Sequence, residues 1–295
     1  MIRRSINWQV MEMTRPLHYL HGMERPGTER LGIERLGIGD HLREWRQRRR
    51  LSQLDLALDA EISTKHLSFL ETGRAQPSRD MVLRLAERLD VPLRERNVLL
   101  VSAGYAPVFP QRTLDDPALQ QARKAVELVL KGHEPYPALA VDRHWTLVAH
   151  NAAVPPLLTS AAPKLMQPPA NVLRLSLHPE GLAPRIENLA EWRAHLLARL
   201  RQQIDVTADS VLTKLFDELA AYPAPGGAKA ARTNVMQEYA GVVVPLRFRT
   251  DAGTLSFFST TTIFGTPVDV TLAELAIESF FPADTATADM LRRIG

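Results

Sequence analysis

The chain has 295 residues, of which 45% are hydrophobic, so it is long enough to build two domains with real cores. It has no cysteine, which excludes disulfides and thiolate metal sites. It has no run of roughly 18 apolar residues and no apolar stretch after Arg3 and Arg4, which excludes a membrane span and a secretory signal. These features predict a cytoplasmic protein. The formal net charge is only +3, and basic residues outnumber acidic ones only before residue 105, a modest asymmetry that favours nucleic-acid binding by the N-terminal part.

The first residues contain a short repeat. Residues 24–38 read ERPGT-ERLGI-ERLGI, with a glycine in every unit, and glycine at this density opposes a stable helix. We interpret residues 1–37 as a disordered or poorly packed leader, with Met13 and Met23 as alternative starts. A DNA-contacting arm is the alternative.

Residues 38–104 carry the signals of five short helices. Ser52, Ser63 and Ser78 are candidate N-caps, Pro92 interrupts the chain, and Gly104 ends the last helix. The residues expected to face the core are Ile38, Leu42, Trp45, Leu54, Ala57, Leu58, Leu67, Leu70, Met81, Leu85, Ala86 and Leu89. This pattern predicts a compact all-α domain whose second and third helices form a helix-turn-helix.

The stretch Ser52–Arg74 also carries a family signature. Ser-Gln starts the second helix of the domain and Leu-Ser-Phe-Leu-Glu-Thr-Gly-Arg ends the third, which resembles the phage-repressor-type (XRE/Cro-C1) helix-turn-helix domain. The resemblance implies that Gln53 contacts a DNA phosphate and that Arg46 and Glu71 form a structural ion pair. Glu61 stands where the family usually has glycine, so a left-handed backbone there costs about 1–2 kcal/mol.

The same resemblance implies that the third helix reads a double-stranded DNA operator. The residues expected to face base edges are Thr64, Lys65 and Ser68, with Lys65 on a guanine edge. Phe69 is expected either to touch a thymine methyl group or to pack in the core. Ser63, His66 and Arg74 are expected to contact phosphates. One recognition helix reads few base pairs, so we expect a homodimer with half-sites about 34 Å apart.

Residues 105–116, with Pro107 and Pro110, are predicted to be a linker, and residues 117–295 a second domain. Helices are expected over residues 117–132, from near Asn151, and over 189–204, 211–220, 271–280 and 285–293. Strands are expected over residues 138–141, 145–149, 242–249 and 254–263. This order predicts an α+β domain in which helices cover one face of an antiparallel sheet.

Several phrases of this second domain resemble the ligand-binding domain of MmyB-like regulators. They are Asp142-Arg143-His144-Trp145, His150-Asn151-Ala152, Asn171-Val172-Leu173-Arg174-Leu175, His178-Pro179, Gly253-Thr254-Leu255-Ser256-Phe257-Phe258, Phe264-Gly265-Thr266-Pro267 and Glu278-Ser279-Phe280-Phe281-Pro282-Ala283-Asp284 with Thr287. The resemblance implies a PAS-like fold for the second domain and a fatty acid or other apolar small molecule as its ligand.

An apolar tunnel is therefore expected between the sheet and the helices. Its candidate lining residues are Trp145, Leu147, Leu196, Leu200, Val244, Phe248, Leu255 and Phe257. Such a stripe is also typical of an ordinary core, and only the resemblance favours a pocket. A carboxylate head group could pair with Arg174, Arg185 or Arg193, and the sequence does not choose among them.

Two alternatives remain for the second domain. One is a haem-type sensor with an axial ligand among the histidines at 133, 144, 150, 178 and 195, and the other is a dimerisation or protein-docking module. The sequence has no HExxH motif, nucleophile elbow or phosphate loop, so we expect no enzyme, metal or resident cofactor. The sequence predicts a ligand-responsive, DNA-binding transcriptional regulator.

Overall fold

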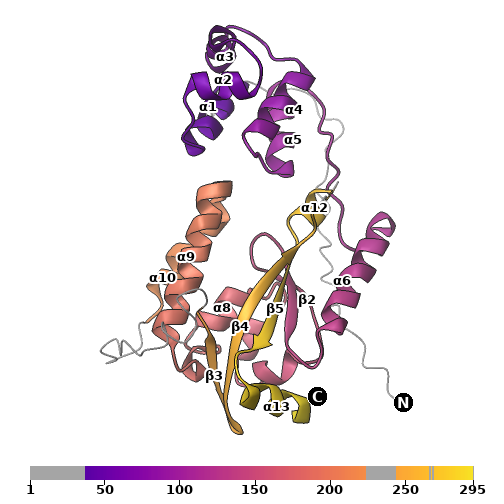
Figure 1. The fold of residues 1–295 in the computed structure, drawn as a ribbon, viewed down its shortest axis with the longest axis vertical. Coiled ribbons are helices and arrows are strands. Elements are labelled where there is room, and N and C mark those ends of the chain that lie inside the picture. The colour runs from indigo at the N-terminus through magenta and orange to yellow at the C-terminus, as the bar shows by residue number, and fades with distance from the viewer. Residues whose placement is uncertain (1–36, 224–243, 266, 268, 295) are drawn as a thin grey trace, which may run out of the picture. The chain divides into compact units, whose positions relative to one another are not determined.

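A computed structural model describes residues 37–223, 244–265, 267 and 269–294 (Figure 1). The chain divides into two compact units, and it passes from one to the other between Pro110 and Gln111. This point lies inside the segment 105–116 that was predicted to be a linker. The predicted leader, except for Gly37, lies outside the described residues.

The described part of the N-terminal unit consists of short helices, as predicted. They are α1 (Ile38–Arg48), α2 (Gln53–Asp59), α3 (Thr64–Glu71), α4 (Arg79–Arg88) and α5 (Leu93–Ser102). Ser52, Ser63 and Ser78 each accept a hydrogen bond from the backbone amide three residues later, so all three predicted N-caps are confirmed. The helices enclose one core, centred on fully buried leucines of all five helices.

The predicted buried face of α2 was wrong at two of its three residues, and only Ala57 is buried as predicted. Leu54 and Leu58 are 56% and 68% exposed, whereas Leu56, Ala57 and Ala60 are buried. Leucines at 54, 56 and 58 allow two helical stripes of equal quality, so spacing alone cannot select one. The tertiary structure buries the stripe that ends in the small Ala60. In α4, likewise, Val82 is buried and Met81 only partly.

The C-terminal unit contains a five-stranded antiparallel sheet in the order β2-β1-β5-β4-β3, which confirms the predicted α+β class. The strands are β1 (Ala138–Val141), β2 (Leu147–His150), β3 (Leu246–Thr250), β4 (Gly253–Ile263) and β5 (Ala276–Pro282). Both predicted hairpins are present. The start of the predicted strand at residues 242 and 243 lies outside the described residues.

The helix predicted over residues 271–280 was wrong. Only α12 (Val270–Ala273) is helical there, and β5 follows as the central strand, paired with β1 on one side and β4 on the other. Leu275, Ala276 and Glu278 favour helix locally, but two neighbouring strands offer the backbone a complete set of partners. Tertiary pairing therefore overrides the local propensity.

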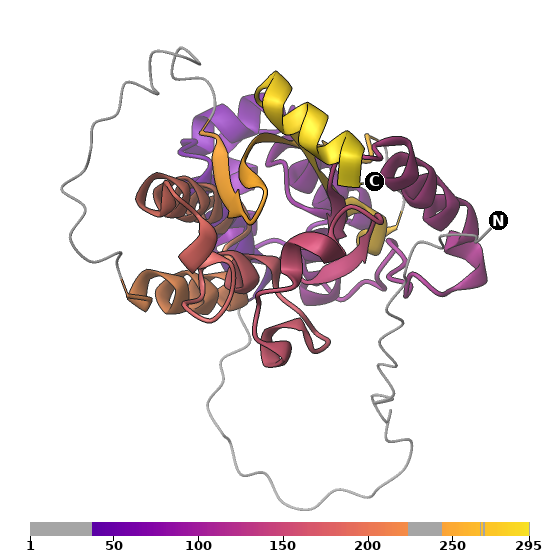
Figure 2. The same cartoon turned by 90° about the horizontal axis from the view of Figure 1, so that it is seen from below.

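Helices lie on both faces of the sheet, not on one as predicted (Figure 1, Figure 2). Val126 and Leu130 of α6 (Gln120–Gly132) pack on Ala138 and Ala140, while Val141 belongs to the core on the opposite face. That second core is covered by α8 (Val172–Leu177), α9 (Leu189–Thr207) and α10 (Ser210–Ala221). At the end of the chain, α13 (Thr285–Ile294) packs against β4.

The remaining described helical segments are short, namely η1 (Pro117–Leu119), η2 (Pro155–Leu158), α7 (Pro163–Met166) and η3 (Ala183–Arg185). The helix predicted to begin near Asn151 was wrong. The Asn151 side chain is buried and bonds the backbone of Ala138, Leu130 and Tyr136, so it ties the loop to its neighbours. No described helix has both the length and the apolar character that a membrane crossing needs.

Candidate functional site

The turn between α2 and α3 sets the geometry of the N-terminal unit. Glu61 has φ +56°, the left-handed conformation expected where the related domains carry glycine. The backbone N–H of Ile62 donates to the Ala57 carbonyl at 2.9 Å and closes the turn. The left-handed backbone at Glu61 costs about 1–2 kcal/mol. This strained turn keeps α2 and α3 at their crossing angle.

The end of α3 is anchored through the carboxylate of Glu71, whose side chain is fully buried. Arg46 donates to both carboxylate oxygens, from Nε to Oε1 at 2.6 Å and from Nη2 to Oε2 at 2.9 Å. Gln53 Nε2 donates to Oε2 at 2.8 Å, and Arg43 Nη2 donates to the Glu71 carbonyl at 3.0 Å. One carboxylate thus joins α1, α2 and α3.

The electrostatics of Glu71 follow from these contacts. Burial opposes ionisation of the carboxyl, but the hydrogen bonds from Arg46 and Gln53 outweigh it and lower the pKa of Glu71 below its ordinary value. Gly39 brings α1 close to the same place, because a Cβ there would lie 2.6 Å from the Leu70 carbonyl oxygen. The three helices are therefore fixed around the C-terminal end of α3.

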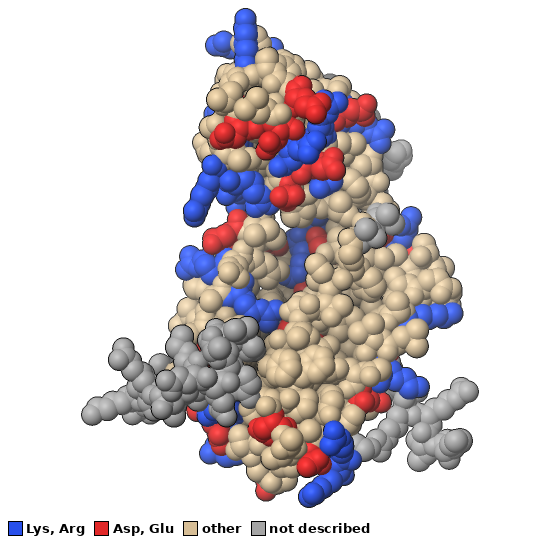
Figure 3. Space-filling model, viewed as in Figure 1, with Lys and Arg blue, Asp and Glu red and all other residues tan. Residues whose placement is uncertain are grey.

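The predicted DNA-contacting residues of α3 lie outside the core. Ser63, Lys65 and Arg74 are exposed, whereas the predicted residues Thr64, His66, Ser68 and Phe69 are partly exposed. The Lys65 ammonium lies 5.7 Å from the centroid of the Phe69 ring, so these two side chains share one face of α3. Figure 3 shows lysine and arginine side chains protruding from the end of the unit that carries α3.

Gln53 has a contact that the sequence did not predict. Its amide nitrogen donates to Glu71, so Gln53 is oriented by the same carboxylate that holds Arg46. The amide group has two N–H donors, and the second has no hydrogen-bond partner among the described residues. Gln53 can therefore stay fixed to Glu71 and still donate to a phosphate.

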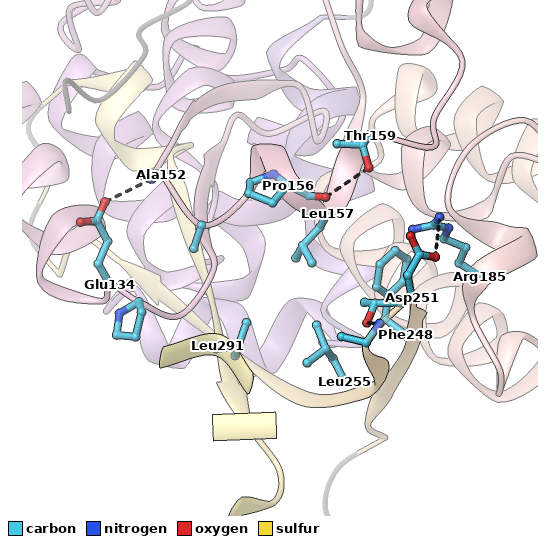
Figure 4. Close-up of a pocket in the computed structure, with 14 residues that line it drawn as sticks. Glu134, Ala152, Pro156, Leu157, Thr159, Arg185, Phe248, Asp251, Leu255 and Leu291 are labelled. Atoms are coloured by element: carbon cyan, nitrogen blue, oxygen red, sulfur yellow. Dashed lines mark hydrogen bonds and ion pairs between the residues drawn. The ribbon is translucent and has the colours of Figure 1, made fainter. Parts of the chain in front are cut away.

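The C-terminal unit contains a cavity of about 540 Å³ (Figure 4). It lies between the β3–β4 hairpin, α13, η3 and the loop around η2, and its wall is mostly apolar. The lining residues are Glu134, Pro135, Ala152, Ala153, Pro156, Leu157, Thr159, Arg185, Phe248, Thr250, Asp251, Ala252, Leu255 and Leu291.

Two of the eight predicted pocket residues, Phe248 and Leu255, line this cavity. The structure places the other six in packed cores. Trp145 and the α9 residues Leu196 and Leu200 belong to one core, with Val244 packed against it. Leu147 packs beside α8, and Phe257 packs with Leu255 and Leu291. Two further lining residues, Leu157 and Leu291, were not predicted; they belong to a proline-rich loop and to α13. No local signal marks them as pocket residues.

The three candidate arginines differ in their contacts. Arg174 donates to Glu218 at 2.8 and 2.7 Å, and Arg193 donates to the carbonyls of Leu219 and Ala220 at the end of α10. Arg185 alone of the three lines the cavity, where its Nη2 lies 3.7 Å from Asp251 Oδ1. The tertiary structure therefore selects Arg185 as the head-group candidate.

The five candidate histidines are dispersed and none of them lines the cavity. His133, His144, His150 and His178 each have a ring nitrogen within 3.0 Å of a backbone or side-chain partner. His195 packs against Trp192, and burial lowers its pKa. Within the described ranges, no group of three acidic or histidine side chains is placed to hold a metal. The cavity thus offers no histidine as an axial ligand.

The helix-turn-helix unit followed by a cavity-bearing α+β unit defines a transcription regulator with a DNA-binding and a ligand-binding part. Comparison with protein families agrees. The family described as "Helix-turn-helix domain" matches residues 38–99, and the family described as "MmyB-like transcription regulator ligand binding domain" matches residues 122–294, more than half of the chain. The chain belongs to the MmyB-like family of transcription regulators.

Individual similar proteins cover less of the chain. A protein of Methanoculleus marisnigri named "Putative HTH-type transcriptional regulatory protein" is 33% identical over an alignment of 120 residues, and the match covers 39% of this chain and 38% of that protein. The chain thus matches well under half the length of this relative. A solved structure described as "Structure of an RNA-binding Light-Oxygen-Voltage Receptor" has 12% identity and a TM-score of 0.24, covering 88% of this chain and 63% of its own.

Proposed function

We propose that the C-terminal unit binds an apolar carboxylate, such as a fatty acid, and that this ligand controls the binding of a homodimer to DNA. The observation that carries the proposal is the cavity between the β3–β4 hairpin and α13, which combines an apolar wall with one arginine at its rim. Membership of a family with a named ligand-binding domain supports the same assignment.

The cavity suits a small amphipathic molecule in size and chemistry. Its volume of about 540 Å³ falls within the range of roughly 300–1,000 Å³ that is usual for small-molecule sites. Leu157, Phe248, Leu255 and Leu291 supply the apolar contacts, and burying a hydrocarbon chain against them contributes about 0.8 kcal/mol per methylene group. These walls favour an alkyl chain over a polar metabolite.

Arg185 is the proposed partner of the ligand's carboxylate. A guanidinium matches a carboxylate with two parallel hydrogen bonds, and none of the described residues accepts a side-chain hydrogen bond from Arg185. Arg174 and Arg193 already donate to acceptors of α10, so binding the ligand there would break existing contacts.

Replacing Arg185 tests the ligand assignment. We expect Arg185→Gln to weaken the binding of decanoate about tenfold or more, because a hydrogen-bonded charge partner contributes about 1.5–3 kcal/mol. Isothermal titration calorimetry on the whole chain measures this change. Arg292→Gln is the control, since Arg292 lies on α13 next to Leu291 but does not line the cavity. Equal affinity of wild type and Arg185→Gln for decanoate would contradict the assignment.

On the DNA side, we propose that Thr64, Lys65, Ser68 and Phe69 face base edges. The partial or full exposure of these side chains supports this role. Ser63, His66, Arg74 and Gln53 are proposed to contact phosphates. Two copies related by a two-fold axis would place two α3 helices in successive major grooves. A ligand that binds one arrangement of the dimer better than another then shifts operator affinity by mass action.

Substitutions in α3 and α2 separate base reading from phosphate contact. We expect Lys65→Ala to reduce discrimination between the selected operator and random duplex by about 1–3 kcal/mol, because a base-edge contact is lost. Gln53→Ala should weaken binding to both duplexes similarly. Affinities for both duplexes at fixed salt give the result, with the operator obtained by selection from random sequences. Equal losses on both duplexes for Lys65→Ala would contradict base reading by this residue.

A further inference from the structure

The rim of the cavity carries a second charge beside Arg185. Asp251 occupies the two-residue turn between Thr250, the last residue of β3, and Gly253, the first of β4. Its Oδ1 lies 3.7 Å from Arg185 Nη2 (Figure 4). The Asp251 side chain is fully exposed and that of Arg185 is 31% exposed, so water reaches both groups.

Strand β3 holds both of these charged residues in place. On the Arg185 side, the strand binds η3 and the residues after it, since Arg249 Nη2 donates to the Pro184 carbonyl at 3.0 Å and Glu187 N donates to the Arg247 carbonyl at 2.9 Å. On the Asp251 side, the Thr250 hydroxyl closes the turn by donating to the Gly253 carbonyl at 2.7 Å. The backbone positions of Arg185 and Asp251 are therefore set by β3 and its turn, which place the two side chains side by side at the rim.

The contact between the two residues is incomplete. A nitrogen–oxygen distance of 3.7 Å is too long for a hydrogen bond, so Asp251 attracts Arg185 without satisfying its N–H donors. An anionic head group that took up those donors would sit beside the Asp251 carboxylate. The head group and the Asp251 carboxylate are both negative and would repel each other, and water and salt reduce this repulsion without removing it.

We propose that Asp251 competes with the ligand's anionic group for Arg185 and so limits the affinity and head-group selectivity of the cavity. The inference rests on the proposed function, because it concerns the same cavity and the same arginine. The Asp251 carboxylate keeps the affinity of the cavity for free carboxylates below the affinity that Arg185 alone would give. The affinity for ligands with an uncharged polar group is unaffected.

The test compares two probes of equal chain length, decanoate and decan-1-ol, on wild type, Asp251→Asn and Asp289→Asn. Asp289 is the matched control, because it is an exposed aspartate on α13 that pairs with Arg292 and does not line the cavity. We expect Asp251→Asn to bind decanoate about two- to fivefold more tightly, within the range for one exposed charge, and to bind decan-1-ol as wild type does. Asp289→Asn should change neither affinity.

A double substitution completes the test. In an Arg185→Gln background, Asp251→Asn should give a clearly smaller gain for decanoate than in the wild-type background, because the group for which Asp251 competes is absent and only the direct repulsion of the head group is relieved. A gain of the same size there, an unchanged decanoate affinity, or an equal gain for decan-1-ol would each overturn the inference while leaving decanoate binding, and with it the proposed function, intact. If wild type and Asp251→Asn bind neither probe, the proposed function itself fails and the inference falls with it.

Discussion

Glu71→Ala is expected to destabilise the helix-turn-helix unit by about 3 kcal/mol and to abolish specific DNA binding. Removing one partner of a buried ion pair costs about 3–5 kcal/mol, because the other charge stays in place without compensation. Arg46 would lose both of its carboxylate contacts, and Gln53 would lose the acceptor that orients it. We expect the lower end of the range, because the Arg46 side chain is 11% exposed and regains some water.

Hydrogen exchange of the amides of α1, α2 and α3 in the whole chain measures this loss for the N-terminal unit alone. Glu44→Ala is the control, since Glu44 is an exposed glutamate paired with Arg48 one turn away. Such a pair contributes about 0.3–0.5 kcal/mol, so protection should hardly change. If Glu71→Ala lost no more protection than Glu44→Ala, the carboxylate would not hold the three helices together.

Phe257→Ala is expected to destabilise the C-terminal unit by about 3–5 kcal/mol. The sequence placed Phe257 among the pocket residues, but the structure places it, 1% exposed, in a core with Leu255 and Leu291. Its ring also meets that of Phe280 edge to face at 6.2 Å between centroids. Truncation leaves a hole in a packed core, so the main effect is on the free energy of unfolding.

Urea unfolding, monitored by hydrogen exchange of the β4 and β5 amides, measures the free energy of unfolding of the C-terminal unit. Phe258→Ala is a matched control on the next position of the strand, where the ring is partly exposed and stacks on Phe281. We expect it to cost clearly less. A stable Phe257→Ala protein that had lost decanoate binding would show instead that Phe257 contacts the ligand.

Local signals in the sequence were sufficient for much of the N-terminal unit. Serine N-caps and the position of Pro92 depend on neighbouring residues only, and the structure contains each of them. The left-handed backbone at Glu61 was suggested by the family resemblance and not by a local signal. The two hairpin turns of the C-terminal unit could also be predicted from local sequence signals. Spacing could not choose between Leu54 with Leu58 and Leu56 with Ala60, because that choice depends on which side of α2 meets the other helices.

The errors in the C-terminal unit have one physical cause. The segment that forms β5 has helix-favouring residues, yet it is a strand because β1 and β4 lie on either side of it. The sequence predicts a helix start near Asn151, but the side chain of this residue bonds backbone groups of residues 130, 136 and 138. In both places, partners distant in the sequence supply the hydrogen bonds that decide the conformation.

By itself, the sequence determined the order of the two units, the helix-turn-helix and the class of the second fold, because caps, turns and hydrophobic periods act over a few residues. Only the tertiary structure decided where the cavity lies and which of the three candidate arginines lines it. Leu157, Arg185, Phe248 and Leu291 come from four separate segments and are brought together by the packing of η2, η3 and α13 around the β3–β4 hairpin. A cavity is the space that packing leaves unfilled, so no single stretch of sequence encodes it.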